Sequence, residues 1–193
     1  LPDEAVVAIT VGRLGPEKNL PFLLNAFKQV AREVPDLHLV IIGKGREEEY
    51  LEEMVRMLDM AGRVHLVGEV LYDKVPNWLA LGDFFVITSV NESHPLSVLE
   101  ALAAGLPVVG IPCPGVEDTI VDGVNGLWSP EDVGAFAAQM RRLAQEPELR
   151  ARLAAGARET SVQYDIRRTS ATLLAHYERL VEKRARKKER HDD

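Results

Sequence analysis

The 193-residue sequence contains only one cysteine, Cys113. A lone cysteine excludes an internal disulfide and a zinc site built from cysteines, so we expect a reducing, cytoplasmic location. No apolar run approaches the ~18–20 residues that span a bilayer. The chain starts with the acidic stretch Leu1-Pro-Asp-Glu, which is neither a signal peptide nor an initiator methionine. We therefore expect a domain taken from a longer protein.

Several ligand-binding motifs are also missing. Gly43-Lys-Gly45 lacks the third glycine of a dinucleotide-binding fingerprint, and there is no Gly-x-x-x-x-Gly-Lys-Ser/Thr loop. Neither Asp-x-Asp nor His-Glu-x-x-His occurs, so we expect no metal site. The net charge of −7 argues against nucleic acid as a partner. We expect no cofactor; any small ligand would be a substrate.

Hydrophobic residues make up 46% of the chain and fall into alternating strand and helix patterns. The pattern predicts strands at 5–11, 37–42, 64–67, 83–88 and 106–111. It predicts helices at 20–34, 47–61, 75–81, 95–104, 131–145, 147–163 and 166–190. Continuously apolar strands separated by helices are typical of a parallel sheet covered on both faces. The predicted fold class is α/β, a Rossmann-like parallel sheet sandwiched by helices, with further helices at the C-terminus.

Polar and glycine-rich stretches follow the predicted strands, at the edge where parallel sheets bind ligands. These stretches are Gly12-Arg13, Gly43 to Gly45, Gly68-Glu69, Asn91 to Pro95 and Pro112 to Gly115. Their position makes Gly12 and Gly43 candidate binding residues.

Glu92 and Glu100 flank the start of the helix predicted at 95–104. Pro95 suits the first helical position, and the next three backbone N–H groups would then be free, with the positive end of the helix dipole behind them. These groups belong to Leu96, Ser97 and Val98. An anion site flanked by carboxylates fits a ligand with both phosphate and hydroxyl groups, because carboxylates accept hydrogen bonds from sugar diols. The pattern predicts a nucleotide-sugar site.

The loop from Gly12 to Asn19 offers two cations to the same ligand. Arg13 and Lys18 lie five residues apart across a turn containing Gly15 and Pro16. We expect both side chains to converge on one diphosphate. The alternative is a solvated loop whose charges have no ligand.

Together these residues resemble the C-terminal, donor-binding domain of retaining GT-B-fold glycosyltransferases of group 1, also called family 4. Members carry a Gly-Arg-x-x-x-x-Lys-(Asn/Gly) loop, matched by Gly12, Arg13, Lys18 and Asn19. They carry two glutamates separated by seven residues and then Ala-x-Ala-x-Gly-x-Pro-Val-Val, matched by Glu92, Glu100, Ala101, Ala103, Gly105, Pro107, Val108 and Val109. A third element, Asp-Gly-x-Asn-Gly, is matched by Asp122, Gly123, Asn125 and Gly126. The resemblance runs from about residue 5 to 125, and more loosely to the end.

The resemblance implies a role for each matched residue. Arg13 and Lys18 would bind the diphosphate, Glu92 the hydroxyls of the donor sugar and Glu100 the ribose diol. Arg13, Lys18 and Glu92 are thus the implied catalytic contacts, and the donor would be a UDP- or GDP-sugar bound without metal.

Other binding contacts are implied around these residues. The backbone of Leu96 and Ser97 would complete the phosphate site, and Val70 would border the base. The family usually has Gly-Phe-(Pro/Gly) after the first glutamate, whereas this chain has Ser93-His94-Pro95. We interpret His94 as a helix-start residue, with a side-chain contact to ligand as the alternative.

The predicted organisation is a nucleotide-sugar-binding domain at 1–163 and a C-terminal helix with a basic tail at 164–193. An N-terminal acceptor-binding domain, absent from this chain, would be the partner that completes a glycosyltransferase, and this chain alone would be inactive. Two alternatives stay open: a non-catalytic nucleotide-sugar-binding or scaffolding module, and a fragment of a sugar-nucleotide epimerase. Because the tail is basic, peripheral contact with the inner face of a membrane is a further alternative.

Overall fold

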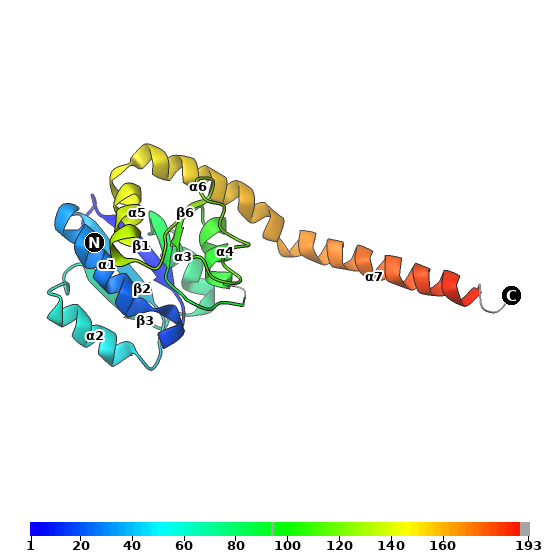
Figure 1. Ribbon diagram of the computed structural model, residues 1–193, viewed down its shortest axis with the longest axis horizontal. Helices are drawn as coiled ribbons and strands as arrows, with labels where there is room; N and C mark the ends of the chain where they lie inside the picture. The colour runs from blue at the N-terminus through cyan, green and yellow to red at the C-terminus, as the bar shows by residue number, and fades with distance from the viewer. Residues whose placement is uncertain (94, 190–193) are drawn as a thin grey trace.

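The computed structural model describes residues 1–93 and 95–189 of the chain. Its centre is a parallel sheet with the strand order β3-β2-β1-β4-β5-β6 (Figure 1). The strands are β1 (Val6–Val11), β2 (Leu37–Ile42), β3 (Val64–Gly68), β4 (Phe84–Ile87), β5 (Val108–Gly110) and β6 (Gly126–Trp128). The predicted fold class is confirmed.

The strands are continuously apolar because both faces of the sheet are covered. In β4, Phe84 and Val86 belong to the apolar cluster on one face, whereas Phe85 and Ile87 belong to the cluster on the other. All four side chains are at most 5% exposed. Successive side chains of a strand point to opposite faces, so a two-sided core requires this run of apolar residues.

Helices form the two outer layers (Figure 1). Helices α1, α2 and α5 contribute to one apolar cluster, α3 and α4 to the other, and α6 to both. The α-helices are α1 (Leu20–Glu33), α2 (Glu48–Met57), α3 (Val75–Leu79), α4 (Leu96–Ala103), α5 (Val133–Gln145), α6 (Pro147–Ser161) and α7 (Ile166–Glu189); the 3-10 helices are η1 (Pro16–Lys18), η2 (Tyr72–Lys74) and η3 (Val162–Tyr164). The helix predicted at 47–61 ends earlier, because Asp59 adopts a left-handed conformation with φ 56°.

The sixth strand, β6, lies in a segment that the sequence did not mark as a strand. It pairs with β5, and the turn before it is held by the side chains of Asp122 and Asn125. Asp122 Oδ1 accepts a hydrogen bond from the Trp128 N–H at 2.9 Å, and Asn125 Oδ1 accepts one from the Val121 N–H at 2.8 Å. The fully buried Asn125 also donates to the Thr119 carbonyl and to Thr160 Oγ1 on α6, both at 3.0 Å. Asp122 and Asn125 therefore fasten β6 to the domain.

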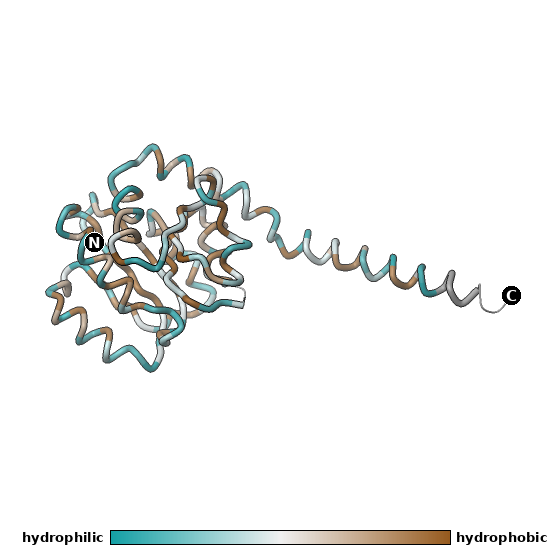
Figure 2. Tube along the Cα trace, viewed as in Figure 1, coloured by the Kyte–Doolittle hydropathy of each residue, from teal (hydrophilic) through white to brown (hydrophobic). Residues whose placement is uncertain are grey.

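Helix α7 leaves the body of the molecule as a single long rod (Figure 1). At its base the Tyr164 hydroxyl of η3 donates to the Asp118 carbonyl at 2.7 Å, which ties the helix to the loop before β6. Along α7, apolar residues recur at intervals of about one helical turn, with polar residues between them (Figure 2). The exposed apolar stripe of α7 consists of Ile166, Leu173, Leu174, Tyr177, Leu180 and Val181. Among the residues that the structure describes, no helix is both long enough and apolar enough to span a bilayer.

Candidate functional site

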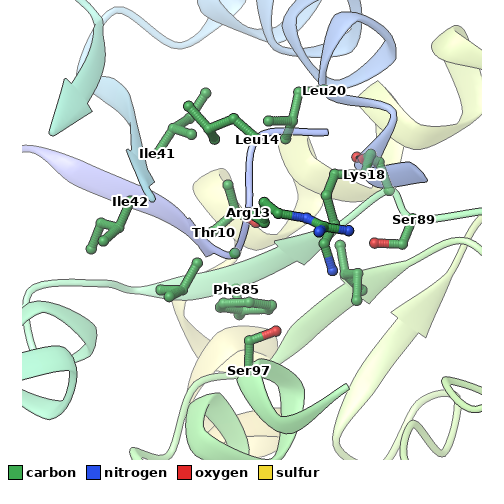
Figure 3. Close-up of a pocket in the computed structure, with 14 residues that line it drawn as sticks. Thr10, Arg13, Leu14, Lys18, Leu20, Ile41, Ile42, Phe85, Ser89 and Ser97 are labelled. Atoms are coloured by element: carbon green, nitrogen blue, oxygen red, sulfur yellow. The ribbon is translucent and has the colours of Figure 1, made fainter. Parts of the chain in front are cut away.

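The predicted site residues gather where the order of the strands reverses. From β1 the chain builds outward to β2 and β3, whereas β4 starts the other half of the sheet on the opposite side of β1. Ligands of such sheets bind in the crevice at this point, beyond the carboxyl ends of the strands. A narrow crevice, partly open to solvent, lies here. Its lining includes Gly12, Arg13, Lys18, Ser89 and Ser97 (Figure 3).

The loop after β1 is fastened to the end of β4. The Thr88 hydroxyl donates to the Lys18 carbonyl at 2.8 Å, and the Val90 N–H donates to the Glu17 carbonyl at 3.1 Å. Asn19 ends the loop in the left-handed region, with φ 51° and ψ 40°. Asparagine and glycine tolerate this conformation better than other residues, which explains why the motif requires one of them after the lysine.

Glycines let the loops after β1 and β2 approach one another closely. A Cβ on Gly43, whose φ is +139°, would overlap the Gly12 carbonyl oxygen, and one on Gly45 would overlap the Leu14 carbonyl. Backbone bonds join the same loops, from Leu14 N–H to the Lys44 carbonyl and from Glu47 N–H to the Leu14 carbonyl. The close packing of these two loops thus explains why residue 43 is a glycine. The contact between Gly43 and a ligand stays a prediction.

Lys18, which lines the crevice, forms an ion pair with Glu92. The Lys18 ammonium donates to Glu92 Oε1 at 2.5 Å, and the two side chains are only 22% and 13% exposed. The residues are 74 positions apart, so the sequence could not reveal this pair. Such partly buried, charge-assisted hydrogen bonds are stronger than exposed ones.

Arg13 has a different partner. Its guanidinium binds Glu17, four residues further along the chain, with Nη2 and Oε1 2.8 Å apart. This hydrogen bond is the main reason why the pKa of Glu17 is lowered. The Arg13 side chain is 77% exposed. Both cations line the same crevice as predicted, but in the structure each is paired with its own carboxylate rather than directed at a shared point.

The loop after β5 supports Glu92 from behind. Gly115 has a φ of +82°, and a Cβ there would lie 2.5 Å from the Glu92 carbonyl and 2.8 Å from that of Ser93. Cys113 is buried in the same loop; burial and, secondly, the charge of Glu92 raise the pKa of its thiol. Only glycine allows the two loops to come this close, so the sequence around Gly115 helps to place Glu92.

Helix α4 begins one residue later than predicted, at Leu96 rather than at Pro95. Pro95 is the N-cap residue, and its carbonyl accepts a hydrogen bond from the Val98 N–H at 3.0 Å, so that group is not free for a ligand. Ser97 lines the crevice, whereas the Leu96 side chain is 60% exposed. His94, the remaining predicted residue of this segment, lies outside the described residues.

Glu100 is half-buried on the first turns of α4 and contacts a residue that the sequence did not single out. The Tyr72 side chain lies beside it, and the hydrogen bond to Glu100 is the first cause of the raised pKa of the Tyr72 hydroxyl, followed by the charge of the carboxylate. Tyr72 itself is 77% exposed. Val70, two residues earlier, packs against the apolar cluster formed with α3 and α4. No pattern in the sequence pointed to this contact, because it joins the segment after β3 to a residue on α4.

Within residues 1–93 and 95–189, no three His, Cys, Asp or Glu side chains are grouped so that they could hold a metal ion. The polar side chains that line the crevice are instead two cations and several hydroxyls, and each cation is paired with a carboxylate. This set can hold a ligand that has an anionic part and hydroxyl groups.

Comparison with known proteins gives a consistent result. The family model described as glycosyl transferases group 1 matches residues 1–160. A sulfoquinovosyl transferase of Arabidopsis thaliana is 33% identical over 168 residues, which cover 85% of this chain and 31% of that protein. The chain spans less than half of the length of the curated relatives it matches.

Solved structures share the fold. The pneumococcal O-GlcNAc transferase GtfA, in complex with UDP and GlcNAc, superposes with a TM-score of 0.79 at 26% identity, over 94% of this chain and 37% of that one. The C-terminal domain of a group 1 glycosyl transferase, LpcC of Francisella tularensis, gives a TM-score of 0.73 at 21% identity, over 84% of this chain and 87% of that one. The second match covers nearly the whole of a single domain.

Proposed function

This chain belongs to the glycosyl transferases group 1 family, and on that premise we propose that it is the donor-binding domain of a retaining glycosyltransferase. It binds the nucleotide diphosphate sugar whose sugar is transferred to an acceptor. The observation that carries the proposal is the gathering of Lys18, Glu92 and Ser97 at the carboxyl ends of β1 and β4. The complex of a similar transferase with UDP and GlcNAc supports a nucleotide-sugar ligand.

Each part of the crevice has a role in this proposal. The Lys18 ammonium, the Arg13 guanidinium and the start of α4 hold the diphosphate, and they stabilise the charge that develops when it leaves the sugar. Glu92 accepts hydrogen bonds from the sugar hydroxyls. Glu100, with Tyr72 beside it, accepts them from the ribose diol. In this scheme the diphosphate requires no divalent ion, because the cations and the helix dipole take its place.

The acceptor site lies, in this proposal, on an N-terminal domain of the same protein. Two observations support such a partner. The relatives are more than twice as long as the segment they share with this chain. The apolar side chains of Leu173, Leu174 and Tyr177 on α7 are each more than half exposed. We assign the α7 stripe to the N-terminal domain, which would cover it. The cytoplasmic location and the contact between the basic tail and lipid headgroups stay predictions.

Nucleotide binding to residues 1–193 tests the proposal directly. Calorimetry with UDP, GDP and ADP and their glucose or mannose derivatives should identify one nucleoside diphosphate that binds. Lys18→Ala should weaken that binding by about 1.5–3 kcal/mol, the range for a hydrogen bond to a charged group. Arg13→Ala should have a smaller effect, because this side chain is largely solvated and already paired.

Lys28→Ala is the matched control, since Lys28 lies two turns along α1 and away from the crevice. It should leave nucleotide affinity unchanged. Failure of all the nucleotides to bind, or equal losses from Lys18→Ala and Lys28→Ala, would refute the proposed site.

A further inference from the structure

The Lys18–Glu92 ion pair has a consequence beyond the separate roles of its members. We propose that Glu92 is a positioning residue for Lys18, and that the pair makes the site favour a diphosphate that carries a sugar over the bare nucleoside diphosphate. This inference rests on the proposed function. In this inference, the Lys18–Glu92 contact distinguishes the sugar-bearing donor from the nucleoside diphosphate that remains after transfer.

Both partners are held in place by the backbone around them. The Lys18 carbonyl is bound by the Thr88 hydroxyl, and the Lys18 side chain passes over Gly12, where an added Cβ would lie 3.3 Å from Cε. On the other side, the Glu92 backbone lies against Gly115. The backbone on both sides of the pair is therefore held in place, and neither side chain is fully solvated.

The crevice does not carry an excess of positive side chains. Arg13 and Lys18 both line it, and each is paired with a carboxylate, Arg13 with Glu17 and Lys18 with Glu92. A diphosphate that approaches Lys18 thus meets an ammonium whose charge is already offset by a carboxylate 2.5 Å away. Lysine has three N–H donors, so Lys18 can bind phosphate without releasing Glu92, but the carboxylate then offsets the ammonium charge that attracts the phosphate.

The sugar of a donor removes this conflict. Its hydroxyl groups donate to the Glu92 carboxylate and take over part of the role of the Lys18 ammonium, which becomes freer to bind the diphosphate. When the sugar has been transferred, those donors are gone. Glu92 then competes again for Lys18, and the hold on the remaining nucleoside diphosphate weakens. The pair thus favours entry of the donor and release of the product.

The inference predicts opposite effects of one substitution on two ligands. Glu92→Gln keeps the shape of the side chain and its ability to accept a hydrogen bond, but it removes the charge. Binding of the bare nucleoside diphosphate should tighten about tenfold, because the Lys18 ammonium then offers its full charge to the phosphates. The preference for the sugar-bearing donor over the bare diphosphate should shrink by at least the same factor.

The experiment is calorimetry on residues 1–193 with UDP, GDP and ADP, with UDP-glucose, GDP-mannose and ADP-glucose, and with inorganic pyrophosphate, which needs no base contact. Circular dichroism melts would confirm that each variant is folded. Two matched glutamate changes serve as comparisons. Glu159→Gln, an exposed position on α6, should change nothing. Glu100→Gln should weaken the binding of every nucleoside diphosphate, because its partner is the ribose.

A double-mutant cycle separates positioning of Lys18 from simple repulsion of the phosphate. Lys18→Met alone should weaken diphosphate binding. If Glu92 acts through Lys18, Glu92→Gln should give no tightening in the Lys18→Met background. Tightening of equal size in both backgrounds would overturn the positioning role.

The remaining outcomes distinguish this inference from the proposed function. If the wild-type chain binds a nucleoside diphosphate but Glu92→Gln leaves its affinity unchanged or lower, the inference alone is wrong. If neither chain binds any of the probes, both the inference and the proposed function are overturned.

Discussion

Replacing Asn125 by alanine should destabilise the domain without acting on the ligand. The side chain is fully buried and makes three hydrogen bonds, accepting one from the Val121 N–H and donating to the Thr119 carbonyl and Thr160 Oγ1. Although this asparagine belongs to a motif shared with glycosyltransferases, every polar atom of its side chain is engaged inside the protein.

The cost follows from the groups that alanine would leave behind. The Val121 N–H and the Thr119 carbonyl lose their hydrogen bonds to the Asn125 side chain. Thr160 Oγ1 keeps its bonds to the Gly156 and Ala157 carbonyls. Two backbone groups would lose a hydrogen bond, one of them at a partly solvated position. We therefore expect the free energy of unfolding to fall by about 2–4 kcal/mol. For a chain of this size the melting temperature should fall by roughly 5–15 °C.

Guanidinium unfolding of Asn125→Ala measures this loss, with Asn25→Ala as the control. Asn25 is exposed on α1 and donates only to the Pro21 carbonyl in its own helix, so its substitution should stay within about 0.5 kcal/mol of the wild type. At a temperature where both variants are folded, nucleotide affinity should be the same. Equal stability of the two variants, or a loss of affinity without a loss of stability, would refute the structural role of Asn125.

Three further predictions concern other parts of the chain. Asn19→Ala should cost about 1 kcal/mol in chemical unfolding because of the left-handed backbone, whereas Asn19→Gly should be nearly neutral; equal costs would mean that the conformation is not required. Burial lowers the pKa of both His38 and His65, which are stacked with ring nitrogens 3.1 Å apart, so the unfolded state binds more protons and stability should fall as the pH drops below about 6.5. His38→Phe should flatten this dependence between about pH 7 and 5, as followed by urea unfolding at each pH. Nucleotide affinity should survive EDTA, and a metal-dependent affinity would require ligands other than those described.

The sheet could be predicted from the sequence because its strands carry apolar residues on both faces. The strand β2 has the predicted limits, since Leu37 to Ile42 is apolar apart from His38 and lies between Asp36 and Gly43. The strand β6 was missed because it has only three residues and follows a turn, so its signal is the hydrogen bonding of Asp122 and Asn125 rather than a hydrophobic pattern.

The sequence predicted which residues lie at the candidate site, but not which of them pair with one another. Motif spacing and the rule for parallel sheets placed Lys18 and Glu92 at one edge. The contact between them depends on the loop conformation set by Thr88, Asn19 and Gly115, which no local pattern encodes. The contact between Tyr72 and Glu100 likewise joins elements distant in sequence.

The length of α7 gives the small joint at its base a mechanical importance. Its 24 residues form a rod about 36 Å long, so a rotation of about 10° at the base would displace the far end by about 6 Å. The joint consists of η3 and Asp165, and the Tyr164 hydroxyl bonded to the Asp118 carbonyl is its anchor. Small torsional changes at this joint would change the position of any domain that packs on α7. The Tyr164 hydroxyl therefore lies at the pivot of α7, and a small rotation there moves the far end of the helix by a distance comparable to the width of a sugar ring.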